Sequence, residues 1–262
     1  MNKENPKNSE KTSKKYVALA KVRAPTGISI YYPLTTTSAP NYPLPPPTTL
    51  VGALAYPYLR TKIFVELVED SENVYSPAIL ILDKVIYATA GAEGWTVSKD
   101  AERVYQLIYQ RKDRWKSLEY AYSVGVRGSV YYLHDKLYLL YILTDKELTN
   151  YIYGITRIGR KESLVSIEDV IVEELEKTIK AVGSGTFETY FYLPEEIATC
   201  VNSEIIALPK LTKENLGRAT SPIVERYHLS KGLGPIRGNL KSSGALLEVD
   251  GFEIPVPKHL VS

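Results

Sequence analysis

Hydrophobic and polar residues alternate near the start of the chain, in the stretch "YVALAKVRA" from Tyr16 to Ala24. A period of two residues is typical of a β-strand, so we expect a strand here. One face of this strand begins with apolar residues and ends in Lys21 and Arg23, which indicates an exposed, basic strand end.

A proline-rich loop follows this strand and leads into the segment "TTLVGALAYPYL". Apolar residues recur there at helical spacing between Leu50 and Leu59. We therefore predict a helix that begins at Thr48 or Thr49, with Gly52 inside its second turn.

The pattern of the next hundred residues predicts further elements. They are a strand over residues 76–91, a helix over 98–115 capped by Ser98, a β-hairpin over 129–143 that turns at His134 and Asp135, a short helix over 144–154 with a capping box from Thr144 to Glu147, and a strand reached through the basic turn 156–164. Residues 16–175 thus fit the β-α-β-β-α-β order of a ferredoxin-like, RRM-type domain with an insertion.

The two ends of the chain have a different character. Residues 176–262 contain frequent prolines, no long helical period and short β-like runs, which predicts a smaller, loop-rich β domain. Residues 1–15 are polar and lysine-rich without an apolar segment, and we interpret them as a disordered basic tail and not as a signal peptide. The predicted fold class is therefore α+β.

Charge and cysteine content narrow the choice of function. The formal charge is only +2, from 32 basic and 30 acidic residues, so a basic site must be local. The lone cysteine, Cys200, excludes an internal disulfide framework and a cysteine cluster for zinc, which suits a reducing, cytoplasmic environment. Apolar runs such as residues 137–143 are far shorter than the roughly 20 residues that a membrane helix needs. We expect no metal, no cofactor and no membrane contact.

Two short basic segments are candidate phosphate sites. The turn 156–164 places Arg157, Arg160 and Lys161 around Gly159, where a backbone can approach a phosphate closely. Taken alone, these residues favour an ordinary solvated turn, because basic turns are common at protein surfaces. Arg127 lies between two glycines and could form a second such site or a β-bulge.

Other motifs carry weaker signals. The glycine-rich stretch 230–244, which contains Arg237, could be a flexible loop that wraps a nucleic-acid backbone or a disordered surface loop, and it does not match a P-loop. The His134–Asp135 pair resembles half of a metal-phosphohydrolase site, but a tight turn is the favoured interpretation. The acidic run 168–176 alternates with Val and Ile, as a half-exposed face would. We therefore assign no catalytic residue.

The strand with a basic end, followed by "YPLPPPTTLVGALAYPYL", resembles the start of the CRISPR-associated RAMP proteins of the fifth Cas family. In that family a Pro-Thr-Thr-Leu-x-Gly segment begins the first helix of a ferredoxin-like domain. The turn "RIGRKESLVSIEDV" is similar to the family's Gly-Arg-rich turn before the last strand of that domain, and the resemblance covers most of residues 16–262.

The resemblance implies a crRNA-binding subunit of a type I Cascade complex, most like archaeal type I-A members. Such a subunit holds the 5′ handle of the crRNA and contacts the repeated RAMP backbone subunit and the large and small Cascade subunits. The usual RNP1 pattern of an RNA-reading sheet does not occur in this sequence, so we expect RNA contacts from loops and basic turns.

The helix start then makes sense as part of an RNA surface. Thr48 and Thr49 can cap the helix or offer hydroxyls to phosphate, and free N–H groups of the first turn favour an anion. Gly52 costs about 1 kcal/mol in a helix but removes a side chain that would keep a nucleotide away; close packing of the helix on a sheet is the open alternative.

The predicted RNA-binding residues are Lys21, Arg23, Thr48, Thr49, Gly52, Arg127, Arg157, Arg160, Lys161 and, more weakly, Arg237. Two alternatives remain open. One is a metal-independent endoribonuclease that cleaves the CRISPR repeat with a Tyr, Lys and His constellation, as one subtype of the family does. The other is a scaffold that contacts only protein.

Overall fold

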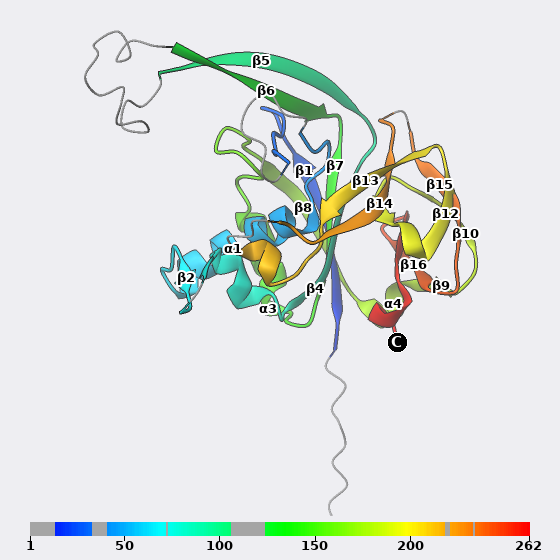
Figure 1. Cartoon of the computed structure of the whole chain (residues 1–262). Coiled ribbons are helices and arrows are strands. Elements are labelled where there is room, and N and C mark those ends of the chain that lie inside the picture. Colours follow the sequence, from blue (N-terminus) through cyan, green and yellow to red (C-terminus); the bar gives the residue numbers. More distant parts are fainter. Residues whose placement is uncertain (1–13, 33–40, 72, 106–123, 218–220, 233) are drawn as a thin grey trace, which may run out of the picture.

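The computed structural model describes residues 14–32, 41–71, 73–105, 124–217, 221–232 and 234–262, with the side chains of 101–105 and 124–127 left out. It is a mixed α/β structure of mostly antiparallel strands and few helices. Figure 1 shows a central sheet with helices on one side and the C-terminal strands on the other.

The central sheet contains four strands in the order β4 (Val85–Ala92), β7 (Leu137–Leu143), β1 (Tyr16–Arg23) and β8 (Ser166–Glu174). Every neighbouring pair is antiparallel. Strand β7 is buried along its whole length because β1 and β4 flank it and both of its faces are covered.

Helix α1 (Pro47–Lys62) packs on one face of this sheet through its apolar stripe, which includes Leu50 and Leu54. The Tyr141 hydroxyl of β7 donates a hydrogen bond to the Leu50 carbonyl oxygen at 3.1 Å. Pro47 occupies the first helical position, where its missing N–H and restricted φ cost nothing.

Short elements surround α1. They are the ribbon of β2 (Val68–Glu69) and β3 (Val74–Tyr75), the 3-10 turn η1 (Pro77–Ile81), the helix α3 (Glu147–Tyr151) and the turn η4 (Ile152–Gly154). The predicted short helix and its end at Gly154 are confirmed. Its cap differs from the predicted capping box, because the Asp145 carboxylate accepts the Glu147 N–H bond at 2.9 Å.

The C-terminal strands cover the opposite face of the central sheet. Alternate residues of a strand point to opposite faces, so Ala18 and Ala20 of β1 join the α1 core while Val17 and Leu19 pack with residues such as Leu247. The N- and C-terminal parts of the chain therefore share a hydrophobic core. The domain boundary at residue 175 stays a prediction.

The C-terminal part is β-rich, as predicted. Its elements are α4 (Leu175–Thr178), β9 (Ile179–Val182), β10 (Thr186–Thr189), β11 (Leu193–Pro194), η5 (Glu195–Ile197), β12 (Ala198–Val201), β13 (Ser203–Pro209), η6 (Glu214–Leu216), β14 (Val224–Ser230), β15 (Ile236–Leu240), β16 (Gly244–Val249), β17 (Phe252–Pro257) and η7 (Lys258–Leu260). The strands among them form three-stranded sheets in the orders β10-β15-β12, β11-β14-β13 and β17-β16-β9.

The predicted helix over 98–115 is wrong where the structure describes it. Residues 98–105 belong to strand β5 (Trp95–Tyr105), which pairs with β6 (Val124–His134) along its full length, and Figure 1 shows the resulting long ribbon. Residues 106–115 lie outside the described residues. In this pairing the backbone N–H and C=O groups of the segment form hydrogen bonds with β6. This long-range pairing outweighs the helical spacing of its apolar residues.

Two other predictions need correction. The segment 76–91 begins as the 3-10 turn η1, because Ser76 Oγ accepts the Ala78 N–H bond at 3.3 Å, and the strand starts only at Val85. The segment 129–143 is not a hairpin: β6 pairs with β5, whereas β7 pairs with β1 and β4. Because β1 and β4 already pair with the two edges of β7, no edge is left for β6. The chain therefore changes direction between the end of β6 at His134 and the start of β7.

Candidate nucleic-acid interface

A pocket of about 390 Å³ lies between the first half of α1 and the turn 156–164. It is lined by Thr49, Gly52, Ala53, Tyr56, Thr156, Arg157, Gly159, Lys161 and Leu164. The fold thus brings together four residues that the sequence analysis had singled out in two distant motifs: Thr49 and Gly52, with Arg157 and Lys161. We call this pocket the basic groove.

Gly52 lies in the lining of the basic groove with open space beside it. A Cβ atom built on Gly52 would meet no heavy atom within 4 Å. Close packing of the helix on the sheet is therefore not the reason for this glycine. Its effect is to widen the groove at the helix surface.

The first turn of α1 offers fewer free N–H groups than the sequence analysis expects. Pro47 has no N–H group, and the N–H groups of Thr49 and Leu50 both donate to the Pro46 carbonyl oxygen, at 2.9 and 3.1 Å. Neither threonine hydroxyl caps the helix. Of the N–H groups in this turn, only that of Thr48 makes no hydrogen bond within the described residues, so most of the positive charge beside the groove belongs to the Arg157 and Lys161 side chains.

Gly159 determines the shape of the turn on the other side of the groove. Its φ of +87° lies in the left-handed region, and an added Cβ would be 2.6 Å from Ile30 Cγ1 and 2.7 Å from the Ser29 carbonyl oxygen. The next N–H group, that of Arg160, donates to the same Ser29 oxygen at 3.1 Å. Only glycine fits this approach between the turn and residues 29–30.

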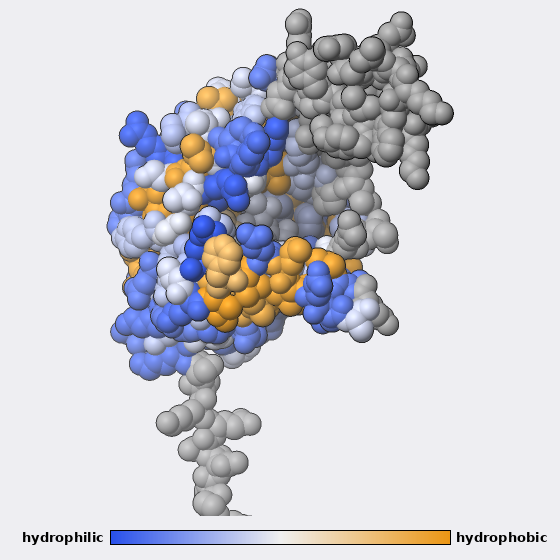
Figure 2. Space-filling model, turned by 90° about the vertical axis from the view of Figure 1, so that its left-hand side faces the viewer, coloured by the Kyte–Doolittle hydropathy of each residue, from blue (hydrophilic) through white to orange (hydrophobic). Residues whose placement is uncertain are grey.

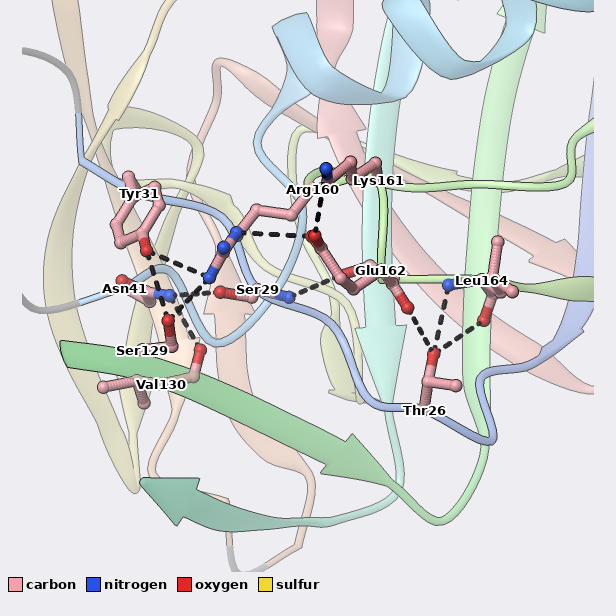
Figure 3. A network of polar contacts seen from close by, with 11 residues as sticks. Thr26, Ser29, Tyr31, Asn41, Ser129, Val130, Arg160, Lys161, Glu162 and Leu164 are labelled. Atoms are coloured by element: carbon pink, nitrogen blue, oxygen red, sulfur yellow. Dashed lines mark hydrogen bonds and ion pairs between the residues drawn. The ribbon is translucent and has the colours of Figure 1, made fainter. Parts of the chain in front are cut away.

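Arg160, which the sequence predicts as a phosphate contact, makes its polar contacts within the protein. Its Nη1 donates to Ser129 Oγ at 2.6 Å and to the Tyr31 hydroxyl at 3.1 Å, and its Nε lies 3.5 Å from Glu162 Oε2. The side chain is only 15% exposed. Figure 3 shows the guanidinium pointing into this polar network, so Arg160 ties the turn to β6 and positions it.

Further hydrogen bonds in Figure 3 hold the same turn in place. Thr26 Oγ1 donates to the Glu162 carbonyl oxygen at 2.9 Å and accepts from the Leu164 N–H at 3.1 Å. Asn41 Nδ2 donates to Ser29 Oγ and to the Val130 carbonyl oxygen, both at 2.7 Å. The Ser29 N–H in turn donates to Ser163 Oγ at 3.0 Å, so the turn that carries Arg157 and Lys161 is anchored by hydrogen bonds to the segment that follows β1.

We expect Arg160→Ala to lower the free energy of unfolding by about 2 kcal/mol, because the hydrogen bonds from its charged guanidinium to the Ser129 and Tyr31 hydroxyls are lost. The measurement is urea unfolding followed by circular dichroism. Lys161→Ala is the control, since that side chain is 82% exposed and should change the free energy by less than about 0.5 kcal/mol. Equal unfolding midpoints for the two variants would contradict the positioning role.

Two exposed cations line the basic groove, Arg157 and Lys161. Arg157 has no ion pair among the described residues, and Lys161 lies 3.9 Å from Glu162 on the same turn. Surface ion pairs of that length contribute little, so both cations can meet a phosphate.

Other predicted cations lie apart from the groove. Lys21 pairs with Asp250 at 2.8 Å and with Asp169 at 3.8 Å, and its hydrogen bond with Asp250 raises the pKa of Lys21. Arg237 Nε lies 2.6 Å from Glu188 Oε2 in the C-terminal part. These carboxylates compete with a phosphate for both side chains.

Three more predicted residues do not line the groove. Arg23 is exposed and lines a separate pocket of about 700 Å³ together with Lys21. Thr48 is half-buried on α1 beside the groove. Arg127 lies in β6 opposite Glu102, and its side chain is outside the described residues.

The sequence alone did not single out two aromatic residues near the groove, Tyr56 of α1 and Phe64 just after the helix. A second pocket of about 280 Å³ shares Gly52, Tyr56 and Arg157 with the basic groove and continues to Phe64. Figure 2 views this side of the molecule and shows a band of hydrophobic residues bordered by hydrophilic ones. The spacing of four residues from Gly52 to Tyr56 was the available signal, because it places both on one helix face.

The pocket beside Arg23 contains the elements of the nuclease alternative: His134, Lys136 and Tyr138. The Tyr138 hydroxyl donates to Glu93 Oε1 at 2.6 Å, and burial together with this carboxylate raises the pKa of Tyr138. His134 Nε2 lies 2.7 Å from the Pro43 carbonyl oxygen, and burial lowers the pKa of His134. Both groups are engaged within the protein.

No helix among the described residues is long and apolar enough to span a membrane. In the same part of the chain, no group of three or more His, Cys, Asp and Glu side chains is placed to hold a metal ion.

Comparison with known proteins identifies the class. A crystal structure of a CRISPR protein from Archaeoglobus fulgidus has a similar fold, with a TM-score of 0.55 at 16% identity over 92% of this chain and 99% of that one. The chain is 33% identical over 210 residues to CRISPR system aCascade subunit Cas5 1 of Saccharolobus solfataricus, covering 78% of this chain and 82% of the relative. It is 31% identical over 216 residues to CRISPR-associated protein Cas5 3 of the same archaeon, covering 80% and 85%.

These relatives place the chain among the CRISPR-associated proteins. No family model matches it. At this identity and coverage the chain belongs to the Cas5 family, and the family resemblance found in the sequence is confirmed.

Proposed function

We propose that this Cas5 family member is a non-catalytic, crRNA-binding subunit of a type I, archaeal I-A-like Cascade complex that holds the 5′ handle of the crRNA. The observation that carries the proposal is the basic groove, where Arg157 and Lys161 face the open surface of α1 at Gly52. Guanidinium and ammonium groups bind phosphate, and a missing side chain lets a backbone approach. The name of one relative, an aCascade subunit, supports the complex.

The order of the central sheet supports a ferredoxin-like RAMP domain as the frame of this site. Taken in chain order, its four strands and two helices read strand β1, helix α1, strands β4 and β7, helix α3, strand β8. Strand β7 lies between β1 and β4, and β1 lies between β7 and β8. Both crossovers therefore span an inserted strand, the split arrangement of that motif.

In this proposal the protein partners are the repeated RAMP backbone subunit and the large and small Cascade subunits. A tagged pull-down from the native host tests the assembly, with partner proteins identified and the 5′ ends of bound RNA mapped. We expect a common repeat-derived 5′ end together with RAMP backbone subunits. A complex that brings these subunits but no CRISPR RNA would instead support a protein-only scaffold.

The nuclease alternative has a direct test. Incubating the purified protein with repeat RNA in EDTA should leave the RNA intact, because the hydroxyl of Tyr138 and the ring of His134 are engaged by Glu93 and by the backbone. Specific cleavage that disappears in His134→Ala or His228→Ala would overturn the non-catalytic proposal.

A further inference from the structure

Tyr56 is an exposed aromatic residue at the point where the basic groove meets the second pocket of α1. Its side chain lines both pockets, and the residue is 52% exposed. It follows Gly52 by four residues and precedes Arg60 by four, so the three lie along one face of the helix, about 6 Å apart per step. The open side of Gly52 therefore leads directly to the Tyr56 ring.

Two guanidinium groups approach the Tyr56 ring. The Cζ atom of Arg60 is 5.7 Å from the ring centroid, and that of Arg157 is 6.0 Å from it. Arg60 also lies 4.9 Å from the centroid of Phe64, which is 68% exposed. The result is an exposed row of alternating aromatic rings and planar cations beside the phosphate-binding side of the groove.

Tyr56 contributes little to the fold itself. The buried tyrosines around α1 use their hydroxyls within the protein: Tyr141 donates to the Leu50 carbonyl oxygen and Tyr192 to that of Pro45. The Tyr56 hydroxyl has no hydrogen bond within the described part of the chain, and half of the residue faces solvent. Its ring is left available for a ligand.

We infer that Tyr56 is a stacking platform for one unpaired base of a single-stranded RNA whose neighbouring phosphates lie against Arg157 and Lys161. The inference rests on the proposed function and adds the part of the ligand that the groove recognises. Aromatic rings and guanidinium planes both stack on splayed bases in single-stranded RNA. Stacking requires only a π-face, which every base has. This subsite therefore binds the strand without preference for its base sequence.

The test compares two RNA probes that carry the same phosphates. One is the adenosine octamer rA8, and the other is an octamer of the same ribose-phosphate backbone without bases. We expect Tyr56→Ala to weaken binding of rA8 about tenfold and binding of the abasic octamer less than twofold. Tyr56→Phe keeps the ring and should bind both probes like the wild type. Fluorescence anisotropy with the full-length chain measures all of these affinities.

Tyr153→Ala is the matched control, because Tyr153 is 57% exposed but does not line either pocket of α1. It should leave both affinities unchanged. Urea unfolding checks that each variant is as stable as the wild type.

The outcomes separate this inference from the proposed function. If rA8 binds and Tyr56→Ala has no effect, or weakens both octamers equally, stacking is overturned and the basic groove stands. If neither octamer binds the wild type, the groove and the stacking fail together. Unchanged octamer binding together with loss of a protein subunit from the Tyr56→Ala pull-down would assign this face to a protein contact and also overturn stacking.

Discussion

Replacing Arg157 and Lys161 together by alanine is expected to halve the salt dependence of RNA binding. Each phosphate contact to a single strand contributes about 0.7 to the slope of log affinity against log salt, so about four contacts give a slope near −3. Loss of two contacts should bring the slope to roughly −1.4. The two side chains are the exposed cations of the basic groove, which is why we expect the largest change in binding here.

The measurement is titration of a single-stranded RNA at several salt concentrations. A matched control removes the same two charges elsewhere: Lys210 and Arg226 are exposed residues of the C-terminal part, where they pair with Glu225 and Glu195. Lys210→Ala with Arg226→Ala should leave the slope near its wild-type value. If both double variants change the slope equally, the RNA responds to net charge and the basic groove is not its site.

Gly159→Ala is expected to cause the largest loss of stability, about 3 kcal/mol in the free energy of unfolding. An alanine would combine the cost of a left-handed backbone with a clash against Ile30 and the Ser29 carbonyl oxygen. The turn can relieve that clash only by breaking the contacts that place Arg157 and Lys161. RNA affinity should therefore fall together with stability.

Urea unfolding followed by circular dichroism measures this effect, and Gly52→Ala is its control. Gly52 has open space around its Cβ position and lies inside a helix, so alanine there should raise the free energy of unfolding by up to about 1 kcal/mol. Opposite signs for the two glycines are the expected pattern. A Gly159→Ala variant that unfolds at the wild-type urea concentration would show that the turn adapts without cost.

The candidate site could be predicted only in part from the sequence. Thr49, Gly52, Arg157 and Lys161 were identified from local motifs, and the structure brings them into one pocket. Tyr56 was missed because an aromatic residue at helical spacing looks the same whether its face is buried or open. Only the position of the turn 156–164 against α1 shows that this face is open.

Several charged residues illustrate the same limit. Lys21 and Arg237 are basic in sequence, but distant carboxylates, Asp250 and Glu188, neutralise them in the fold. Arg160 lies in a basic turn that is typical of a protein surface, yet its guanidinium points inward and donates hydrogen bonds to Ser129 and Tyr31. Partners that are far apart along the chain leave no local pattern.

By itself, the sequence determined the elements whose local signals agree with their final surroundings. Strand β1, helix α1 with its Pro-Thr-Thr start, the short helix that ends at Gly154 and strand β8 were all predicted, because periodicity and turn residues act over a few neighbours. The family resemblance rested on the same local segments. Tertiary structure decided the rest. Segment 95–105 is a strand because it pairs with β6, and β7 pairs with β1 and β4 in the middle of the sheet and not with β6 in a hairpin. Long-range backbone pairing and burial outweigh local preference in those segments, and contacts between distant residues also determine which cations remain exposed without a carboxylate partner.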